Sequence, residues 1–260
     1  MFAGMLLRTV ARDCLFLNWA LPEAVLPDPP ARLRYQIHAW QGESWVFASA
    51  VFCHHGGVHL EPLPQLRISY PQVDLRLNVL DAEGIPSVLY RRMLMPAWVV
   101  PWVRLVTRQP AVAAQLWCAR PNRQPEADSW TWRLERGGIV EVRARLASPQ
   151  LGEGPALGSW DRILRYFHER PRGYAAGLTM LHRVDSEVVP GAAVPLAVEI
   201  EGEYLLPRLF DLPGEISWPR LHSSWLCPEM PFSVELGLAL KLPTHEVRQP
   251  EPVAGRVMMR

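Results

Sequence analysis

The chain has 260 residues, of which 49% are hydrophobic and 20% are charged, and its formal net charge is +1. This apolar content excludes an intrinsically disordered chain, and the charge balance argues against a nucleic-acid partner, because phosphate binding requires a basic patch. Arginine supplies 26 of the 27 basic residues, so Lys241 is the only lysine.

Neither the start of the chain nor its longest apolar stretch predicts export or membrane insertion. Within residues 1–20, the apolar stretch is short and is interrupted by Arg8 and Arg12, unlike a secretory signal. Residues 93–103 fall short of the roughly 20 apolar residues that span a membrane. We therefore expect a cytoplasmic protein without a membrane partner.

The four cysteines are scattered along the chain and include no Cys-x-x-Cys pair. Such spacing predicts buried free thiols rather than a disulfide framework or a zinc ribbon.

Strand patterns recur along most of the chain and are separated by glycine or proline. The clearest is a hairpin in which apolar and polar residues alternate on both sides of Gly137-Gly138. The other candidate strands cover residues 33–40, 44–53, 73–80, 87–95, 174–184, 194–203 and 232–240.

Two segments have helical character. Trp160, Ile163 and Phe167 recur at helical spacing after Ser159, a good N-cap, and Pro171 follows the expected helix. Residues 96–107 form a second candidate helix, although Pro101 would remove a backbone donor from its interior.

Many strands, few helices and no alternation of strand with helix predict a mainly β (α+β) protein, an antiparallel β-barrel with a few external helices. Barrels of this size often enclose a ligand cavity. We expect one domain over residues 1–260, with a loosely held tail from about residue 244.

One predicted hairpin carries a family resemblance. Residues 70–79 (YPQVDLRLNV), the turn at residues 81–84 and the return strand at residues 86–90 resemble the core hairpin of the YqjF-like family. This family is also called the domain of unknown function 2071 and is related to acetoacetate decarboxylase. Its pattern reads approximately F-x-E-V-N-x-R-T-Y-V, then a turn and G-[IV]-x-F. Arg76 and the hydrophobic positions match, whereas Gln72 and Asp74 replace the glutamate and asparagine, and Pro86 or Ser87 replaces the glycine.

Other parts of the chain extend the resemblance to residues 25–236. Residues 35–52 are similar to the family's paired entry strands, and residues 159–174 are similar to its long helix. The segment Leu221-His222-Ser223 is similar to a late Leu-His-Tyr-Ser segment.

The resemblance implies an acetoacetate-decarboxylase-like barrel with an internal cavity for a small carbonyl or carboxylate ligand. Decarboxylation in that class uses a lysine that forms a Schiff base with the substrate. Here the only lysine, Lys241, lies at the end of the last candidate strand with no cationic lysine neighbour, and the amide of Gln72 cannot act as a general base. We therefore expect ligand binding without Schiff-base catalysis and without a cofactor.

Arg76 is the main candidate for ligand contact. If Val73, Leu75, Leu77 and Val79 face an outer core, then Gln72, Asp74, Arg76 and Asn78 share the opposite face of the strand. A guanidinium in a cavity can hold a carboxylate with two parallel hydrogen bonds, while Asp74 holds the arginine in place. The alternative is an ion pair between Arg76 and Asp74, on a solvent face or in a buried network, without a ligand.

Two further residues complete the predicted ligand set. Arg91 lies on the neighbouring strand next to Arg92, and at most one of two consecutive strand residues can face the cavity. His222 lies beside Ser223, but no Gly-x-Ser-x-Gly elbow occurs to support a hydrolase.

The histidines at positions 54, 55 and 59 do not predict a metal site. Side chains of the consecutive residues His54 and His55 diverge in a strand. His54 and His59 could converge around the Gly56-Gly57 turn, but no second ligand group is evident elsewhere. A polar loop around Gly56-Gly57 is the expected structure.

The sequence thus predicts a barrel protein that binds a small anionic or carbonyl compound. Two alternatives stay open: a lyase or hydrolase that uses acid-base or metal chemistry in the same cavity, and a non-catalytic scaffold whose own tryptophans fill the barrel. The ligand, the question of catalysis and the oligomeric state are not determined by these patterns.

Overall fold

A computed structural model describes residues 6–119, 129–152, 154–176, 180–188, 192–212 and 217–241. The predicted tail from about residue 244 lies outside these ranges. Most of the described chain is β-strand, as predicted.

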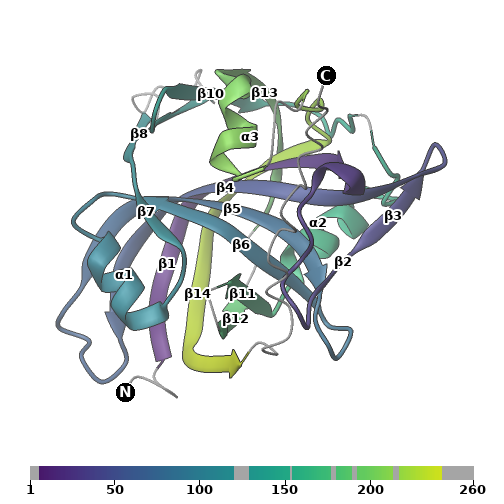
Figure 1. Ribbon diagram of the computed structural model, residues 1–260. Coiled ribbons are helices and arrows are strands. Elements are labelled where there is room, and N and C mark those ends of the chain that lie inside the picture. The colour runs from purple at the N-terminus through teal and green to yellow at the C-terminus, as the bar shows by residue number, and fades with distance from the viewer. Residues whose placement is uncertain are drawn as a thin grey trace, which may run out of the picture.

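Seven strands form a closed ring (Figure 1). Neighbouring strands are antiparallel except for the parallel pair β6 and β11, and β14 pairs back with β1 to close the barrel. In order around the ring, the strands are β1 (Leu6–Pro22), β4 (Glu43–Leu60), β5 (Ile68–Leu80), β6 (Pro86–Met95), β11 (Arg172–Ala176), β12 (Met180–Val188) and β14 (Ser223–Lys241).

A second, smaller sheet lies over the outside of the barrel (Figure 1). It contains the predicted hairpin around Gly137-Gly138 and joins the barrel through a short pairing of β13 with β14. Its strands are β8 (Gln115–Ala119), β9 (Ser129–Glu135), β10 (Ile139–Leu146) and β13 (Val194–Glu201). Three short strands pair with the ring: β2 (Arg34–Tyr35) with β5, β3 (Ile37–Trp40) with β4, and β7 (Ala111–Ala113) with β6.

The helices are short and occupy three places around the barrel (Figure 1): α1 (Val100–Thr107), α2 (Trp160–His168) and α3 (Leu206–Leu209). Single 3-10 turns are η1 (Glu23–Val25) and η2 (Glu203–Leu205). Helix α2 begins directly after Ser159 as predicted, although the serine side chain makes no capping hydrogen bond. Helix α1 begins at Val100, later than predicted, which places Pro101 in the first turn where no backbone donor is needed.

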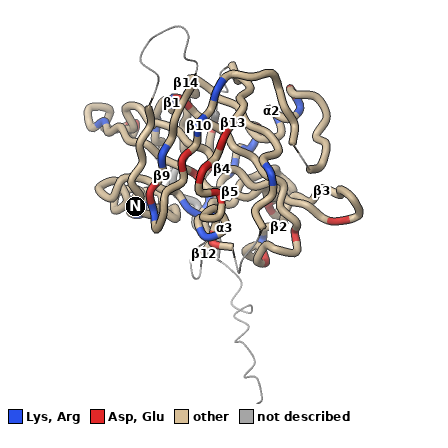
Figure 2. Tube along the Cα trace, turned by 90° about the horizontal axis from the view of Figure 1, so that it is seen from above, with Lys and Arg blue, Asp and Glu red and all other residues tan. Residues whose placement is uncertain are grey.

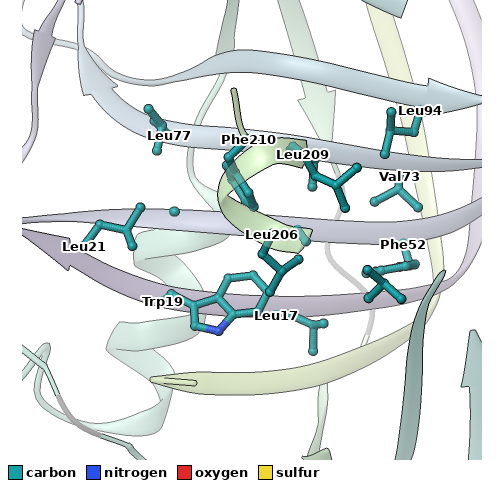
Figure 3. Packing of buried hydrophobic residues seen from close by; sticks show 14 of the residues in the cluster. Leu17, Trp19, Leu21, Phe52, Val73, Leu77, Leu94, Leu206, Leu209 and Phe210 are labelled. Atoms are coloured by element: carbon teal, nitrogen blue, oxygen red, sulfur yellow. The ribbon is translucent and has the colours of Figure 1, made fainter. Parts of the chain in front are cut away.

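The outer face of the barrel strands carries the larger core. Leu206, Leu209 and Phe210 at α3 pack against barrel residues such as Trp19 and Leu77 (Figure 3). The predicted outward orientation of alternate β5 residues is confirmed, because all four belong to this core: Val73, Leu75, Leu77 and Val79.

Strand β1 was not among the predicted strands. Residues 14–21 are buried without interruption, because one face of β1 lines the barrel interior and the other packs under the second sheet. A strand buried on both faces has no apolar-polar alternation to detect.

The expected polar loop at Gly56-Gly57 was also wrong. These glycines lie within β4, where the pairing with β5 shifts register between His55 and Val58, and Gly57 has a φ of 62°. They form a β-bulge that the strand continues past.

Charged residues of both signs are interspersed over the described chain when the molecule is seen from above (Figure 2). No helix in the described ranges combines the length and apolarity needed to cross a membrane.

Candidate functional site

The inner face of the barrel encloses a cavity of about 510 Å³. This volume lies in the range of pockets that hold small organic ligands, roughly 300–1,000 Å³. Its walls come from the inward side chains of β1, β4, β5, β6, β12 and β14, together with α1 and the β4–β5 loop.

Three of the predicted site residues line this cavity on successive inward positions of β5. They are Gln72, Asp74 and Arg76. The Nε2 amide of Gln72 donates a hydrogen bond to Oδ1 of Asp74 over 2.7 Å. The sequence periodicity of β5 therefore placed these side chains on the correct face.

Arg76 has no carboxylate partner. Among the described residues, no acidic oxygen lies within 4.0 Å of its guanidinium, and its Nε is buried without a hydrogen-bond partner. The guanidinium lies over the ring of Phe16, whose centroid is 5.4 Å from the guanidinium carbon. The structure therefore shows no direct contact between the Arg76 guanidinium and the Asp74 carboxyl group, although each charge, beside the larger effect of burial, shifts the pKa of the other group. Removing a cation from water costs several kcal/mol, and without a direct carboxylate partner this arrangement favours a bound anion.

Burial dominates the ionisation of the polar group around Arg76. It raises the pKa of Asp74 to about 6, against the opposing effects of the Gln72 hydrogen bond and the Arg76 charge. Burial likewise raises the pKa of Tyr90 and lowers the pKa of Arg76. Asp74 is thus placed to change protonation state near neutral pH, beside a cation.

Arg91 does not line the cavity, contrary to the prediction. Leu75 pairs with Arg92 and Arg76 pairs with Tyr90, so Arg91 is the extra residue of a β-bulge. Its guanidinium donates to the carbonyl oxygens of Phe210 and Asp211, over 3.2 and 2.9 Å, on the outside of the barrel. Arg92 also lies there, donating to the carbonyl oxygen of Arg208 over 2.8 Å. Both arginines anchor the end of α3.

Asn78 and His222 are also absent from the cavity wall. Asn78 is fully buried one inward position beyond Arg76. His222 precedes β14 and is buried against Phe47, with ring centroids 4.8 Å apart, while its Nε2 lies 3.3 Å from the carbonyl oxygen of Pro155. Asn78 is only two residues from Arg76, and His222 directly precedes β14, yet the cavity does not extend to either residue. Sequence position alone could not predict where the cavity ends.

Tyr90 is a cavity residue that the sequence reading missed. It faces Arg76 across the β5–β6 hairpin, and its ring lies over Gly173 of β11, where a Cβ atom would come within 2.4 Å of the tyrosine ring. Counting outward in pairs from the turn after Leu80 leads to Tyr90 as the partner of Arg76, so the signal was present in the sequence.

Cys53 and His55 form a second polar group on the β4 wall. The Nε2 atom of His55 lies 3.5 Å from Sγ of Cys53, and its Nδ1 lies 3.4 Å from Oγ1 of Thr9. A hydrogen bond with Cys14, together with burial, raises the pKa of the Cys53 thiol. Cys53 is therefore held as a neutral thiol. His54 is exposed while His55 is buried, and the described residues include no group of three potential metal ligands.

The two ends of the barrel differ. Near Arg76, Phe167 of α2 packs against Phe47, and burial together with the Arg76 charge lowers the pKa of His168 to about 4. At the other end, Trp98 and Trp102 of the α1 region line the cavity. Helix α2 thus lies at the end that holds the guanidinium, because Phe16 contacts both Arg76 and His168 of α2. Figure 1 shows α1 on the opposite side of the barrel from α2.

A sequence model of DUF2071, described as an uncharacterized conserved protein, matches residues 8–193. The chain belongs to this family. No curated protein matches it significantly.

Several solved enzyme structures have a similar fold. The enduracididine biosynthesis enzyme MppR with HEPES buffer bound has 13% sequence identity and a TM-score of 0.60, over 93% of this chain and 89% of MppR. MppR complexed with pyruvate has 13% sequence identity and a TM-score of 0.60, over 94% of this chain and 92% of MppR. An acetoacetate decarboxylase-like enzyme from Sphingomonas wittichii RW1 has 16% sequence identity and a TM-score of 0.54, over 92% of this chain and 93% of that enzyme. At this identity the likeness confirms the predicted barrel fold.

Proposed function

We propose that this DUF2071 protein binds a small carboxylate or carbonyl compound in its barrel, with Arg76 as the anion-binding residue. The observation that carries the proposal is the Arg76 guanidinium, which lines the cavity with no carboxylate of the described residues within 4.0 Å. In a low-dielectric cavity, a carboxylate that approaches this cation gains a strong, charge-assisted pair of hydrogen bonds.

The fold is consistent with this ligand class. MppR, which shares the fold, has been solved in complex with pyruvate, a small carboxylate. The alternative of a scaffold whose own tryptophans fill the barrel would leave little space inside the ring. The cavity of about 510 Å³ argues against it.

The proposed binding does not use a Schiff base. No lysine is found among the described side chains that line the cavity. The only lysine, Lys241, ends β14, where its backbone pairs with Met180 of β12.

Acid-base catalysis is a second candidate function, favoured by Asp74. Its pKa of about 6 allows the carboxyl group both to hold and to release a proton near neutral pH. A carboxylate held by Arg76 would lie beside this group, so Asp74 could move a proton at a carbon next to the ligand carbonyl. Gln72 would orient Asp74 through its 2.7 Å hydrogen bond.

Calorimetric titration with pyruvate tests the proposal. Arg76→Met should weaken pyruvate binding by about 2–5 kcal/mol, at least thirtyfold, because it removes one partner of a desolvated charge pair. Arg92→Gln is the matched control, since this arginine lies outside the barrel and should leave binding unchanged. Equal affinity of the Arg76→Met variant and the parent protein would overturn the assignment.

The Schiff-base question has its own test. Incubation with pyruvate and cyanoborohydride should add no mass to the intact protein. A covalent adduct at Lys241 would contradict the proposal.

A further inference from the structure

The open end of the cavity is bordered by exposed apolar side chains. Eleven large apolar side chains are exposed in the described part of the chain, and five of them also line this one cavity. These five, here called the mouth residues, are Leu63 (45% exposed), Leu66 (69%), Trp98 (55%), Trp102 (62%) and Leu105 (60%). Apolar surface concentrated in this way marks a binding site more often than a solvated surface.

Helix α1 has apolar residues on both of its sides. Val99 and Val103 are buried beneath the helix. Trp98, Trp102 and Leu105 follow one another at spacings of four and three residues, so they share a different side that stays exposed. Packing against the barrel explains the valines, but it does not explain the second stripe.

The cavity connects this mouth to Arg76. Alternate residues of β5 from Ile68 to Arg76 line it, a path of eight residue steps or roughly 26 Å at about 3.3 Å per step. Between the two ends the wall is largely apolar, with Val51, Val58, Met93, Phe232 and Val234 among its residues. A three-carbon acid bound at Arg76 would leave most of this path empty.

The polar groups along the path are partly satisfied by one another. Gln72 bonds to Asp74, and His55 lies within 3.5 Å of both Cys53 and Thr9. Among the described residues that line the cavity, Arg76 is the only arginine or lysine. The cavity therefore offers one anion-binding site at one end and an apolar channel leading away from it.

We propose that the ligand is an amphipathic monocarboxylate, with its carboxylate at Arg76 and an apolar tail that extends to Trp98 and Trp102. This inference rests on the proposed role of Arg76 and adds the class of tail. An acyl chain or aryl-alkyl chain would cover the mouth residues that the unliganded protein exposes to water.

Calorimetric titration with a straight-chain series tests the tail. Butanoate, hexanoate, octanoate, decanoate and hexadecanoate are compared below their micelle-forming concentrations, together with decanol. Each added methylene should tighten binding roughly fourfold as it leaves water. Decanol should bind at least thirtyfold more weakly than decanoate, and Arg76→Met should remove most of that difference.

A mouth variant separates the tail from the carboxylate. Trp102→Ser should weaken hexadecanoate at least tenfold while leaving butanoate unchanged, because only a chain of about that length approaches the roughly 26 Å between Arg76 and the mouth. Trp117→Ser is the matched control, since Trp117 is 56% exposed on β8 and does not line the cavity. Neither residue is buried, so both variants should fold.

The outcomes distinguish the two proposals. Arg76-dependent binding that is independent of chain length would overturn the tail inference and leave the carboxylate function intact. Equal binding of decanol and decanoate, unaffected by Arg76→Met, would overturn the carboxylate function. Failure of every ligand to bind would overturn both. If Trp102→Ser changed the oligomeric state and not the chain-length dependence, the mouth would be a contact between copies and the tail inference would fall.

Discussion

The two faces of the barrel strands have opposite properties. On β5, Leu75 and Leu77 point outward into a core in which each is at most 1% exposed, beneath the second sheet and α3. Asp74 and Arg76 alternate with them and point inward to the cavity. Adjacent residues of one strand thus serve stability and ligand binding separately. The difference shows that side-chain alternation alone separates the two roles, since a slip of one residue would exchange them.

The largest expected effect belongs to the outer face. Trp132→Ala should lower the free energy of unfolding by about 3–5 kcal/mol, because Trp132 of β9 is fully buried against the barrel, with Phe52 at 5.7 Å between ring centroids. Denaturant unfolding measures the loss. Pyruvate affinity of the folded variant should stay unchanged, and a loss as large as that of Arg76→Met would break the separation of the two faces.

On the inner face, Asp74→Asn should change the free energy of unfolding in the opposite direction, toward greater stability. The folded pKa of about 6 exceeds the ordinary value of 3.8, so the wild-type protein loses stability as the pH rises from about 4 to 6 and stays at the lower level above that. Removing the charge should raise the free energy of unfolding at pH 8 by about 1–3 kcal/mol. Denaturant titrations at pH 4 and pH 8 measure the difference.

Asp81 supplies a control of opposite sign for Asp74. Burial acts to raise the pKa of Asp81, but hydrogen bonds from Arg172, from Tyr174 and from the backbone outweigh it and lower the pKa. Asp81→Asn should therefore destabilise the protein above pH 4. If Asp74→Asn instead lowered the free energy of unfolding at pH 8, the view that the ionised Asp74 side chain destabilises the folded protein would be contradicted.

Ligand binding should depend on pH through Asp74. A carboxylate at Arg76 places a second negative charge near Asp74, which raises the pKa of Asp74 further, so binding takes up a proton. Pyruvate affinity should fall by up to about tenfold per pH unit above pH 6. Calorimetry between pH 5.5 and 8 tests this, and Asp74→Asn should show a flat profile. A wild-type profile as flat as that of the variant would exclude coupling of Asp74 to the ligand.

The smallest expected effect concerns Tyr90. Tyr90→Phe should weaken pyruvate binding by about 0.5–1.5 kcal/mol if its hydroxyl group donates to the bound carboxylate. Tyr204→Phe serves as the control, because Tyr204 is 80% exposed outside the cavity. Unchanged affinity in Tyr90→Phe would restrict the polar site to Arg76, Asp74 and Gln72.

Local patterns in the sequence determined a substantial part of this structure. Alternation placed Gln72, Asp74 and Arg76 on one face of β5, and helical spacing after Ser159 identified α2. The hairpin motif indicated the DUF2071 family, which the match over residues 8–193 confirms. These features are visible because side-chain direction and helix period depend on neighbours within a few residues.

Only the tertiary structure decided how these pieces form a site. The bulge at Arg91 turns that arginine outward, and the pairing of β1 with β14 closes the ring around Arg76. The position of Trp102 at the far end of the same cavity also depends on this closure. Bulges and long-range pairings are set by contacts between residues far apart in sequence, so no local pattern records them.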